Sequence, residues 1–209
     1  MRPPLSLSAS IVASAALLSD FGPGVAVAAT PEALATDLQR GGYIILMRHM
    51  SSPMAPPDSQ AADPQNVDYE RQLDDKGRAD AKAFGEALRR VAIPIGRVWT
   101  SPAYRARETA ELADLPTPQT VPELAERSNS MTSQPDAKSV AWLINTSASK
   151  PADHSNTIII THMPNIAAAF PAVASGLSAG DAIILKPNGR TDEIIGTIKV
   201  DQWPGLHSR

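Results

Sequence analysis

The sequence predicts an α/β fold in one domain, a three-layer sandwich with a mainly parallel sheet between helices. Two short segments, residues 43–47 and 157–161, are strongly apolar and partly β-branched. Such runs are typical of strands that helices cover on both faces. Segments with helical periodicity alternate with them, which is the order expected of a parallel sheet. With 209 residues, 43% of them hydrophobic, the chain can form one sizeable core.

The first 28 residues have the pattern of a secretory signal peptide, which leaves a single domain at residues 29–209. Arg2 precedes an uncharged stretch, Leu5–Leu18, and a small-residue site follows at Ala26–Val27–Ala28. The stretch is too short to span a bilayer, and a buried N-terminal helix is the alternative. We therefore expect cleavage, a periplasmic or secreted protein of 181 residues, and no transmembrane anchor.

The first half of the domain is predicted to alternate helices with strands. Thr30–Pro31–Glu32 combines a cap, a proline at the first position and an acidic first turn, so a helix should begin there and end at Gly41. The strand at residues 43–47 follows. A longer helix should begin at Asp74 and stop before Pro94. Its apolar residues recur at helical spacing: Phe84, Ala87, Leu88 and Val91.

The pattern continues to the C-terminus. A short strand is predicted at residues 97–100, and Ser101–Pro102 has the composition of a cap and first turn for the next helix. Further elements are expected as a helix at 137–146, a strand at 157–161, a helix from Pro164 that Pro171 bends, and a hairpin that joins 182–185 to 193–200 around Pro187–Asn188–Gly189. Residues 51–71 and 115–135 are long, irregular stretches, typical of functional lids or disordered segments.

Composition excludes several kinds of chemistry. The chain has no cysteine, which rules out disulfides, thiolate metal sites and a cysteine nucleophile. Nineteen basic against 22 acidic residues give a net charge of −3, so no global basic field favours nucleic acid. Any chemistry must come from histidine, carboxylate, arginine or hydroxyl groups.

Two of the four histidines directly follow the two most apolar strands. Arg48–His49 follows residues 43–47, and His162 follows residues 157–161. Ligands of such sheets bind beyond the carboxyl ends of the strands. A single histidine at a strand end is most often structural, but two, with an arginine beside one, indicate a site. His154 and His207 lie in polar segments and are expected on the surface.

A third segment, Ser101–Ala110, places two arginines in the helix that follows residues 97–100. A helix N-terminus offers free N–H groups and a positive dipole end to an anion. Arg105, in the first turn, would add a planar fork that suits phosphoryl oxygens. Arg107 is expected to be a solvated charge on the helix face.

These residues resemble the histidine phosphatase superfamily, which has the phosphoglycerate-mutase-like fold, in its small, single-domain bacterial branch. The resemblance rests on Arg48–His49, the Ser101–Ala110 block and His162, with Leu73 and Gly77 matching a further family pattern. It implies that His49 is a nucleophile that takes up the phosphoryl group as phosphohistidine. It also implies that Arg48, Arg105 and His162 bind the phosphoryl oxygens, with no metal and no cofactor.

The resemblance leaves some positions open. The family's proton donor is a glutamate in a Leu-x-Glu context, which Glu126 matches, with Glu123 as the alternative. The glycine usual after Arg-His is Met50 here, which suggests an altered turn or an apolar wall of the pocket. The hydroxyl group usual nearby is either Ser51 or Ser52.

The sequence thus predicts an exported phosphatase that hydrolyses phosphomonoesters. The expected partner is a small phosphorylated substrate, such as an envelope phosphosugar or the lipopolysaccharide core; oligomeric state is left unassigned. One alternative is a phosphohistidine-protein phosphatase. Another, which Met50 keeps open, is a non-catalytic phosphate-binding or interaction protein on the same fold.

Overall fold

The computed structural model describes residues 29–53, 70–126 and 135–207. The predicted signal peptide, most of the stretch at 51–71 and part of that at 115–135 lie outside these residues. Within the described ranges, no helix has the length and apolar character needed to cross a membrane.

The described elements alternate between helices and strands. The first half of the domain contains α1 (Pro31–Arg40), β1 (Ile44–Arg48), α2 (Asp75–Arg90), β2 (Ile95–Thr100), α3 (Tyr104–Leu112), β3 (Gln119–Thr120) and the 3₁₀ turn η2 (Pro122–Leu124). The second half contains α4 (Ala137–Ser147), β4 (Asn156–Thr161), α5 (Met163–Ala169), α6 (Pro171–Ala174), β5 (Ala182–Pro187), β6 (Asp192–Ile198) and the 3₁₀ turn η3 (Trp203–Gly205).

The sheet of the described residues is mixed, so the prediction of a mainly parallel sheet fits only in part. Its strand order is β3-β2-β4-β1-β5-β6. The pairs β2–β3, β2–β4 and β1–β4 are parallel, whereas β1–β5 and β5–β6 are antiparallel. The two strands of the predicted hairpin therefore join the edge of the same sheet beside β1. The apolar run of β5 indicates burial, which does not depend on the direction of the strand.

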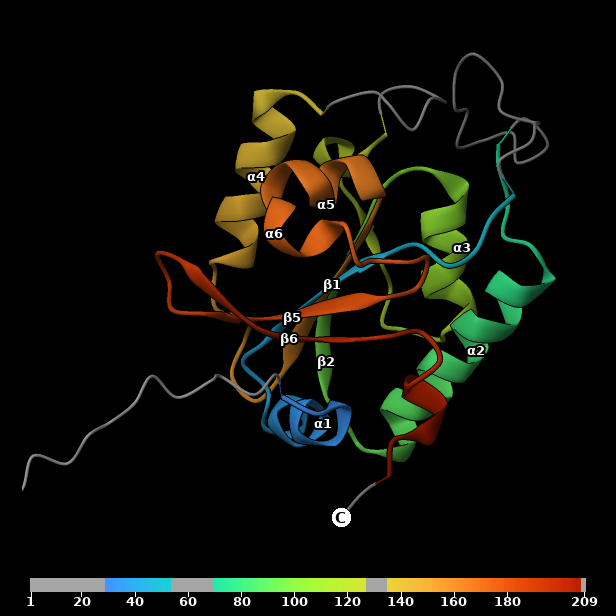
Figure 1. Ribbon diagram of the computed structural model, residues 1–209, viewed down its shortest axis with the longest axis vertical. Coiled ribbons are helices and arrows are strands. Elements are labelled where there is room, and N and C mark those ends of the chain that lie inside the picture. Colours follow the sequence, from blue (N-terminus) through green and yellow to red (C-terminus); the bar gives the residue numbers. More distant parts are fainter. Residues whose placement is uncertain (1–28, 54–69, 127–134, 208–209) are drawn as a thin grey trace, which may run out of the picture.

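Helices cover both faces of the sheet, as the layered prediction required (Figure 1). On one face, α1, α2 and α3 pack on a core that contains Leu34, Phe84 and Trp203. On the other, α4, α5 and α6 pack on a second core that contains Leu143, Ile159 and Ile166. The sheet is thus buried on both sides along β1 and β4, and the carboxyl ends of these two strands meet at one edge.

Local signals explain most helix boundaries. Thr30 caps α1 by accepting the Ala33 N–H, and Asp74 caps α2 by accepting the Gly77 N–H. Helix α5 ends at Ala169 and α6 begins at Pro171, so the predicted bend is a break between two short helices. A Cβ at Gly77 would collide with the carbonyl oxygen of Ser51, so this glycine lets the start of α2 approach the segment after β1.

Candidate active site

His49 lies directly beyond β1 and is fixed by the main chain on both sides. Its N–H donates to the Thr161 carbonyl at the end of β4 (3.0 Å), and its carbonyl accepts from the Gly180 N–H (3.2 Å). The side chain is 3% exposed. The sheet edge therefore holds the backbone of this residue independently of any ligand.

The hydrogen bonds of the His49 ring assign its tautomer. Nδ1 lies 2.7 Å from the Met50 carbonyl oxygen, which can only accept, so Nδ1 carries the proton. Nε2 accepts from Arg105 Nε at 3.2 Å. The lone pair is therefore at Nε2, where Arg105 engages it in this arrangement.

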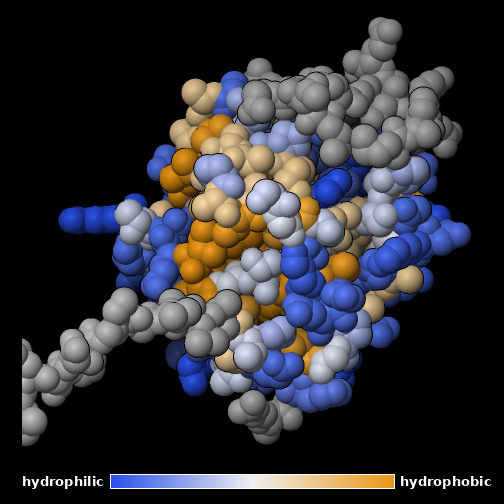
Figure 2. Space-filling view, in the orientation of Figure 1, coloured by the Kyte–Doolittle hydropathy of each residue, from blue (hydrophilic) through white to orange (hydrophobic). Residues whose placement is uncertain are grey.

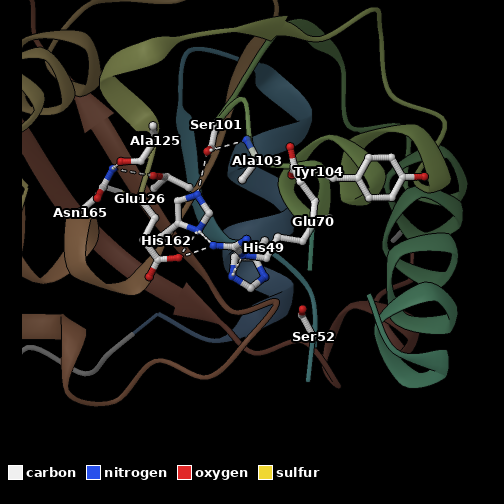
Figure 3. Close-up of polar contacts among 12 residues, drawn as sticks. His49, Ser52, Glu70, Ser101, Ala103, Tyr104, Ala125, Glu126, His162 and Asn165 are labelled. Carbon is white, nitrogen blue, oxygen red and sulfur yellow. Dashed lines mark hydrogen bonds and ion pairs between the residues drawn. The ribbon is translucent and has the colours of Figure 1, made fainter. Parts of the chain in front are cut away.

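His162 follows β4 and brings its ring beside that of His49 (Figure 3). The ring centroids are 5.2 Å apart, with an interplanar angle of 61°. His162 Nε2 lies 2.7 Å from the Ser101 hydroxyl, and Nδ1 lies 3.3 Å from Arg105 Nη2. Because Arg105 only donates, Nδ1 accepts from it, and Nε2–H donates to Ser101 in this arrangement.

Both imidazoles are neutral in this environment. Burial lowers the pKa of His49 well below its usual range, and the adjacent Arg105 guanidinium acts in the same direction. Burial likewise lowers the pKa of His162, followed by the charge of Arg105 and the proximity of His49. A nucleophilic imidazole must be neutral, so this environment suits the role that the resemblance implies for His49.

Arg105 and Glu126 form a buried ion pair between the two histidines. Arg105 Nη2 donates to Glu126 Oε2, and the two side chains are 7% and 8% exposed. Glu126 Oε2 also lies 3.6 Å from His162 Nδ1. The loop that carries Glu126 is held from the β4–α5 connection, where Thr161 Oγ1 and Asn165 Nδ2 both donate to the Leu124 carbonyl (3.1 and 3.0 Å).

Glu123, the alternative proton donor, is placed differently. Its carboxylate pairs with Lys138 Nζ at 2.7 Å, and this contact lowers the pKa of Glu123. That pair belongs to η2 and α4, whereas Glu126 contacts Arg105 directly. Of the two candidates, the structure brings Glu126 to the histidines.

Two further arginines lie around the site. Arg48 Nε is buried and makes no hydrogen bond within the described part of the chain. Burial lowers the pKa of Arg48, and the positive charge of Arg71 lowers it further, while Glu126 and Asp181 raise it. Arg71 is 4% exposed and also lowers the pKa of both histidines. The site therefore brings three guanidinium groups together around the carboxylate of Glu126.

The start of α3 differs from the prediction. The helix begins at Tyr104, and Ser101 does not cap it; its hydroxyl accepts the Ala103 N–H (3.2 Å) and contacts His162. The first N–H of the helix, that of Tyr104, donates to the buried Glu70 carboxylate. The tertiary contact to His162 outweighs the local capping preference, and this N–H serves a protein carboxylate instead of remaining free for an anion.

Met50 does not form a wall of the pocket. Its side chain is fully buried in the core on the α1–α3 face, where it packs against Gly180 and Val200. Its N–H donates to Thr109 Oγ1 (3.1 Å), and its carbonyl accepts from His49. A Cβ at Gly180, which has φ +82°, would lie 2.6 Å from Met50 Sδ, so Gly180 makes room for the methionine.

The remaining predicted residues have structural positions. Ser51 Oγ donates to Asp74, and Ser52 Oγ donates to the Gln72 carbonyl, so both hydroxyls hold the segment before α2. His154 and His207 are exposed, as predicted. Arg107 is half-buried, with its guanidinium 5.4 Å from the Tyr104 ring centroid, so it is not fully solvated.

Three residues near the site were not predicted: Glu70, Arg71 and Asp181. Asp181 accepts from Lys199 Nζ and from the Val200 N–H (both 2.9 Å), and its carbonyl accepts the Arg48 N–H. Glu70 and Arg71 fall in an irregular stretch without periodicity or a motif of their own. The position of each depends on contacts with distant segments.

Comparison with known proteins agrees with this geometry. The chain resembles the protein histidine phosphatase SixA solved with tungstate (TM-score 0.54, 18% identity, 77% of this chain and 98% of that one). It also resembles SixA from Agrobacterium tumefaciens (0.52, 16%, 76% and 97%). A phosphoserine phosphatase mutant from Entamoeba histolytica, in complex with phosphoserine, is similar as well (0.50, 10%, 76% and 97%).

At these identities the structural comparisons establish the fold. No curated protein sequence matches the chain significantly. The family model of the histidine phosphatase superfamily (branch 1) matches residues 44–157, which is more than half of the sequence and includes β1, α2, α3 and the start of β4. The chain therefore belongs to branch 1 of the histidine phosphatase superfamily.

Proposed function

We propose that the protein is a phosphatase that hydrolyses phosphomonoesters through a phosphohistidine on His49. The observation that carries the proposal is the tautomer of His49. Its proton is held at Nδ1 by a main-chain carbonyl, and its bare Nε2 faces Arg105. An unprotonated nitrogen beside a fixed guanidinium is what attack on phosphorus requires.

In the first step, Arg105 Nε–H would move from His49 Nε2 to a phosphoryl oxygen of the bound ester. His49 Nε2 then attacks phosphorus, the N–P bond forms and the P–O bond to the alcohol breaks. Negative charge on the phosphoryl oxygens is neutralised by Arg48 and Arg105. Buried Arg48 Nε, which has no hydrogen bond to the described residues, would then gain an acceptor. Such preorganised donors are worth most in a buried site.

Glu126 would supply the proton that the leaving alkoxide needs. Its carboxylate is now paired with Arg105. A bound phosphoryl dianion would compete for that guanidinium, which would free the carboxyl group of Glu126 to face the leaving oxygen. In the second step, Glu126 would take a proton from water as the water attacks phosphorus, the N–P bond would break, and phosphate would leave.

The assay that tests the proposal uses full-length and leaderless protein with a generic aryl phosphate. We expect turnover by the wild type without added metal, loss of nearly all of it in His49→Ala, and a base-stable phosphoenzyme in the wild type alone. Phosphate release by His49→Ala at the wild-type rate would show that another group is the nucleophile. Absence of turnover with retained vanadate binding would favour the non-catalytic alternative, to which buried Met50 no longer lends support.

A phosphohistidine-protein phosphatase is the second candidate function. It is favoured by the similarity in fold to SixA, whose structure is described as that of a protein histidine phosphatase. Parallel assays with a phosphohistidine protein and with phosphosugars, including lipopolysaccharide-core heptose phosphate, would separate the candidates.

We further propose that residues 1–28 direct export to the periplasm or the medium. A mature N-terminus at Ala29 in the extracytoplasmic fraction is the expected result. Recovery of the intact N-terminus in the cytoplasm would contradict it.

A further inference from the structure

A groove of about 520 Å³ lies between α5, α6 and the segment that precedes β5, and it opens beside Arg48. Five of its described lining residues are apolar: Met163, Ala167, Pro171, Ala174 and Leu177. Ser175 and Arg48 complete the lining. In the space-filling view, the surface over α5 and α6 is coloured mainly as hydrophobic (Figure 2). The volume is in the range of clefts that bind small molecules.

The groove adjoins the candidate active site at Arg48, whose positive charge helps to lower the pKa of both His49 and His162. Arg48 immediately precedes His49, and Met163 immediately follows His162. Arg48 is the one ionisable side chain among the described lining residues, and it stands at the end nearest the histidines. An occupant with an anionic group at that end and an uncharged body along α5 and α6 would complement this distribution of charge.

The lining of the groove is also unfavourable for a ligand whose body is polar. Only Ser175 and Arg48 offer hydrogen-bonding side chains among these described residues. The hydroxyl groups of a sugar placed against Ala167, Ala174 and Leu177 would lose water without gaining protein partners, which is unfavourable. An alkyl or aryl group in the same place would gain from the removal of apolar surface from water.

We infer that the substrate is a phosphate monoester of an apolar alcohol, with its phosphoryl group at His49 and its apolar body in the groove. This inference rests on the proposed function and narrows its substrate class. It favours alkyl or aryl esters over the phosphosugars that the sequence also allows.

Binding of non-hydrolysable phosphonates to the full chain tests the inference without requiring turnover. Methyl-, butyl- and hexylphosphonate, each below its micelle concentration, are titrated by calorimetry. We expect affinity to rise along the series, by at least about tenfold from methyl to hexyl, because each added methylene group buries apolar surface. Equal affinities for the three compounds would overturn the inference.

Matched variants test whether the gain in phosphonate affinity with chain length arises in the groove. Ala167→Gln places a polar side chain in the groove on α5, and Ser175→Gln does so from an exposed position that leaves the core untouched. Both should remove most of the gain for hexylphosphonate while methylphosphonate binds as before. Ala172→Gln, on the exposed side of α6 and outside the groove, is the control and should bind all three compounds like the wild type.

The outcomes separate this inference from the proposed function. Turnover of an aryl phosphate together with equal phosphonate affinities, or with equal effects of Ser175→Gln and Ala172→Gln, would overturn the groove assignment alone. A chain-length gain that the groove variants abolish, without turnover of any ester, would support the groove and contradict the phosphatase activity.

Discussion

The two histidines of the site follow neighbouring parallel strands, yet their rings are held by different kinds of group. His49 Nδ1 donates to a main-chain carbonyl, which can only accept. His162 Nε2 meets the Ser101 hydroxyl, which can accept or donate. The first ring is therefore restricted to one neutral tautomer, whereas the second can keep its Ser101 partner in either neutral tautomer.

This difference matches the two tasks that phosphoryl transfer sets. A nucleophile needs a lone pair in a constant position, which the Met50 carbonyl enforces. A group that binds the phosphoryl oxygens must respond as negative charge arrives and leaves. In the absence of a ligand His162 Nδ1 accepts from Arg105, and a bound dianion would favour a proton on Nδ1 while Ser101 stays bonded to Nε2.

The largest expected effect is the difference in turnover between the glutamine variants of the two histidines. Turnover should fall by at least about 10⁴-fold in His49→Gln, because the nucleophile is removed. It should fall by about 10²–10³-fold in His162→Gln, because one stabilising contact to the phosphoryl group is lost. Radiolabelled substrate should still label His49 in His162→Gln and should leave His49→Gln unlabelled. Labelling of His49→Gln would contradict the assignment of His49 as the nucleophile.

A second prediction perturbs the His49 tautomer from a distance. In Gly180→Ala the new Cβ would lie 2.6 Å from Met50 Sδ and 2.7 Å from Val200 Cγ2. Displacement of Met50 would weaken the bond that holds the proton at Nδ1, so kcat should fall by roughly tenfold or more, in line with the cost of small misplacements at reacting groups. The measurement is kcat and KM as a function of pH.

The matched control is Gly189→Ala. Its φ is +94°, so the backbone strain is similar, but a Cβ there would meet nothing within 4 Å. Part of the activity of Gly180→Ala should return in the double variant with Met50→Ala, which removes the obstructing side chain. If Gly189→Ala loses as much kcat as Gly180→Ala, strain alone explains the effect and Met50 has no positioning role.

Much of the fold followed from local signals in the sequence. The caps at Thr30 and Asp74 and the break at Pro171 act within a few residues, and all three are present in the structure. Where a local signal met a stronger tertiary contact, the prediction was wrong. Ser101 has the composition of a cap, but its hydroxyl is committed to His162, and the helix begins later.

The residues of the candidate site likewise include some that local sequence signals located and some that they did not. Arg48, His49 and His162 could be located because the ends of buried parallel strands converge. Glu70 and Asp181 could not, since their positions depend on partners in other segments of the chain, Tyr104 for Glu70 and Lys199 for Asp181. A residue placed by long-range contacts leaves no periodic trace in the sequence.

A smaller effect is expected when the hydroxyl group of Ser101, the partner of His162 Nε2, is removed. In Ser101→Ala the His162 ring loses the bond at Nε2, while the His49 contacts remain. We expect a loss of roughly tenfold in kcat/KM, comparable to one hydrogen bond to a charged group. The acidic limb of the pH profile should shift, because the protonated ring is no longer stabilised. Ser101→Thr retains the hydroxyl and should restore that limb; a profile identical to wild type in Ser101→Ala would remove Ser101 from the mechanism.

The smallest effect concerns stability without ligand. Both buried rings are neutral in the folded protein and have lowered pKa values, whereas in the unfolded chain they take up protons near pH 6.5. The contribution of the two neutral rings to the free energy of unfolding is therefore complete above about pH 6.5. It is lost as pH falls toward the pKa values of the folded state. Each ring can add a slope of up to about 1.4 kcal/mol per pH unit in that window.

Urea unfolding between pH 5.0 and 7.5 measures this slope. His162→Gln should reduce the slope of the unfolding free energy against pH by about the contribution of one titrating group. His207→Gln, at an exposed position, should leave the slope unchanged. Repeating the measurement with added inorganic phosphate shows which of the two rings takes up a proton when the anion binds. If the bound anion favours a proton on His162 but not on His49, phosphate should flatten the slope of the wild type and have little such effect in His162→Gln. Equal flattening in both proteins would mean that His162 is not the group that takes the proton, and the response to the bound anion assigned to His162 would then be wrong.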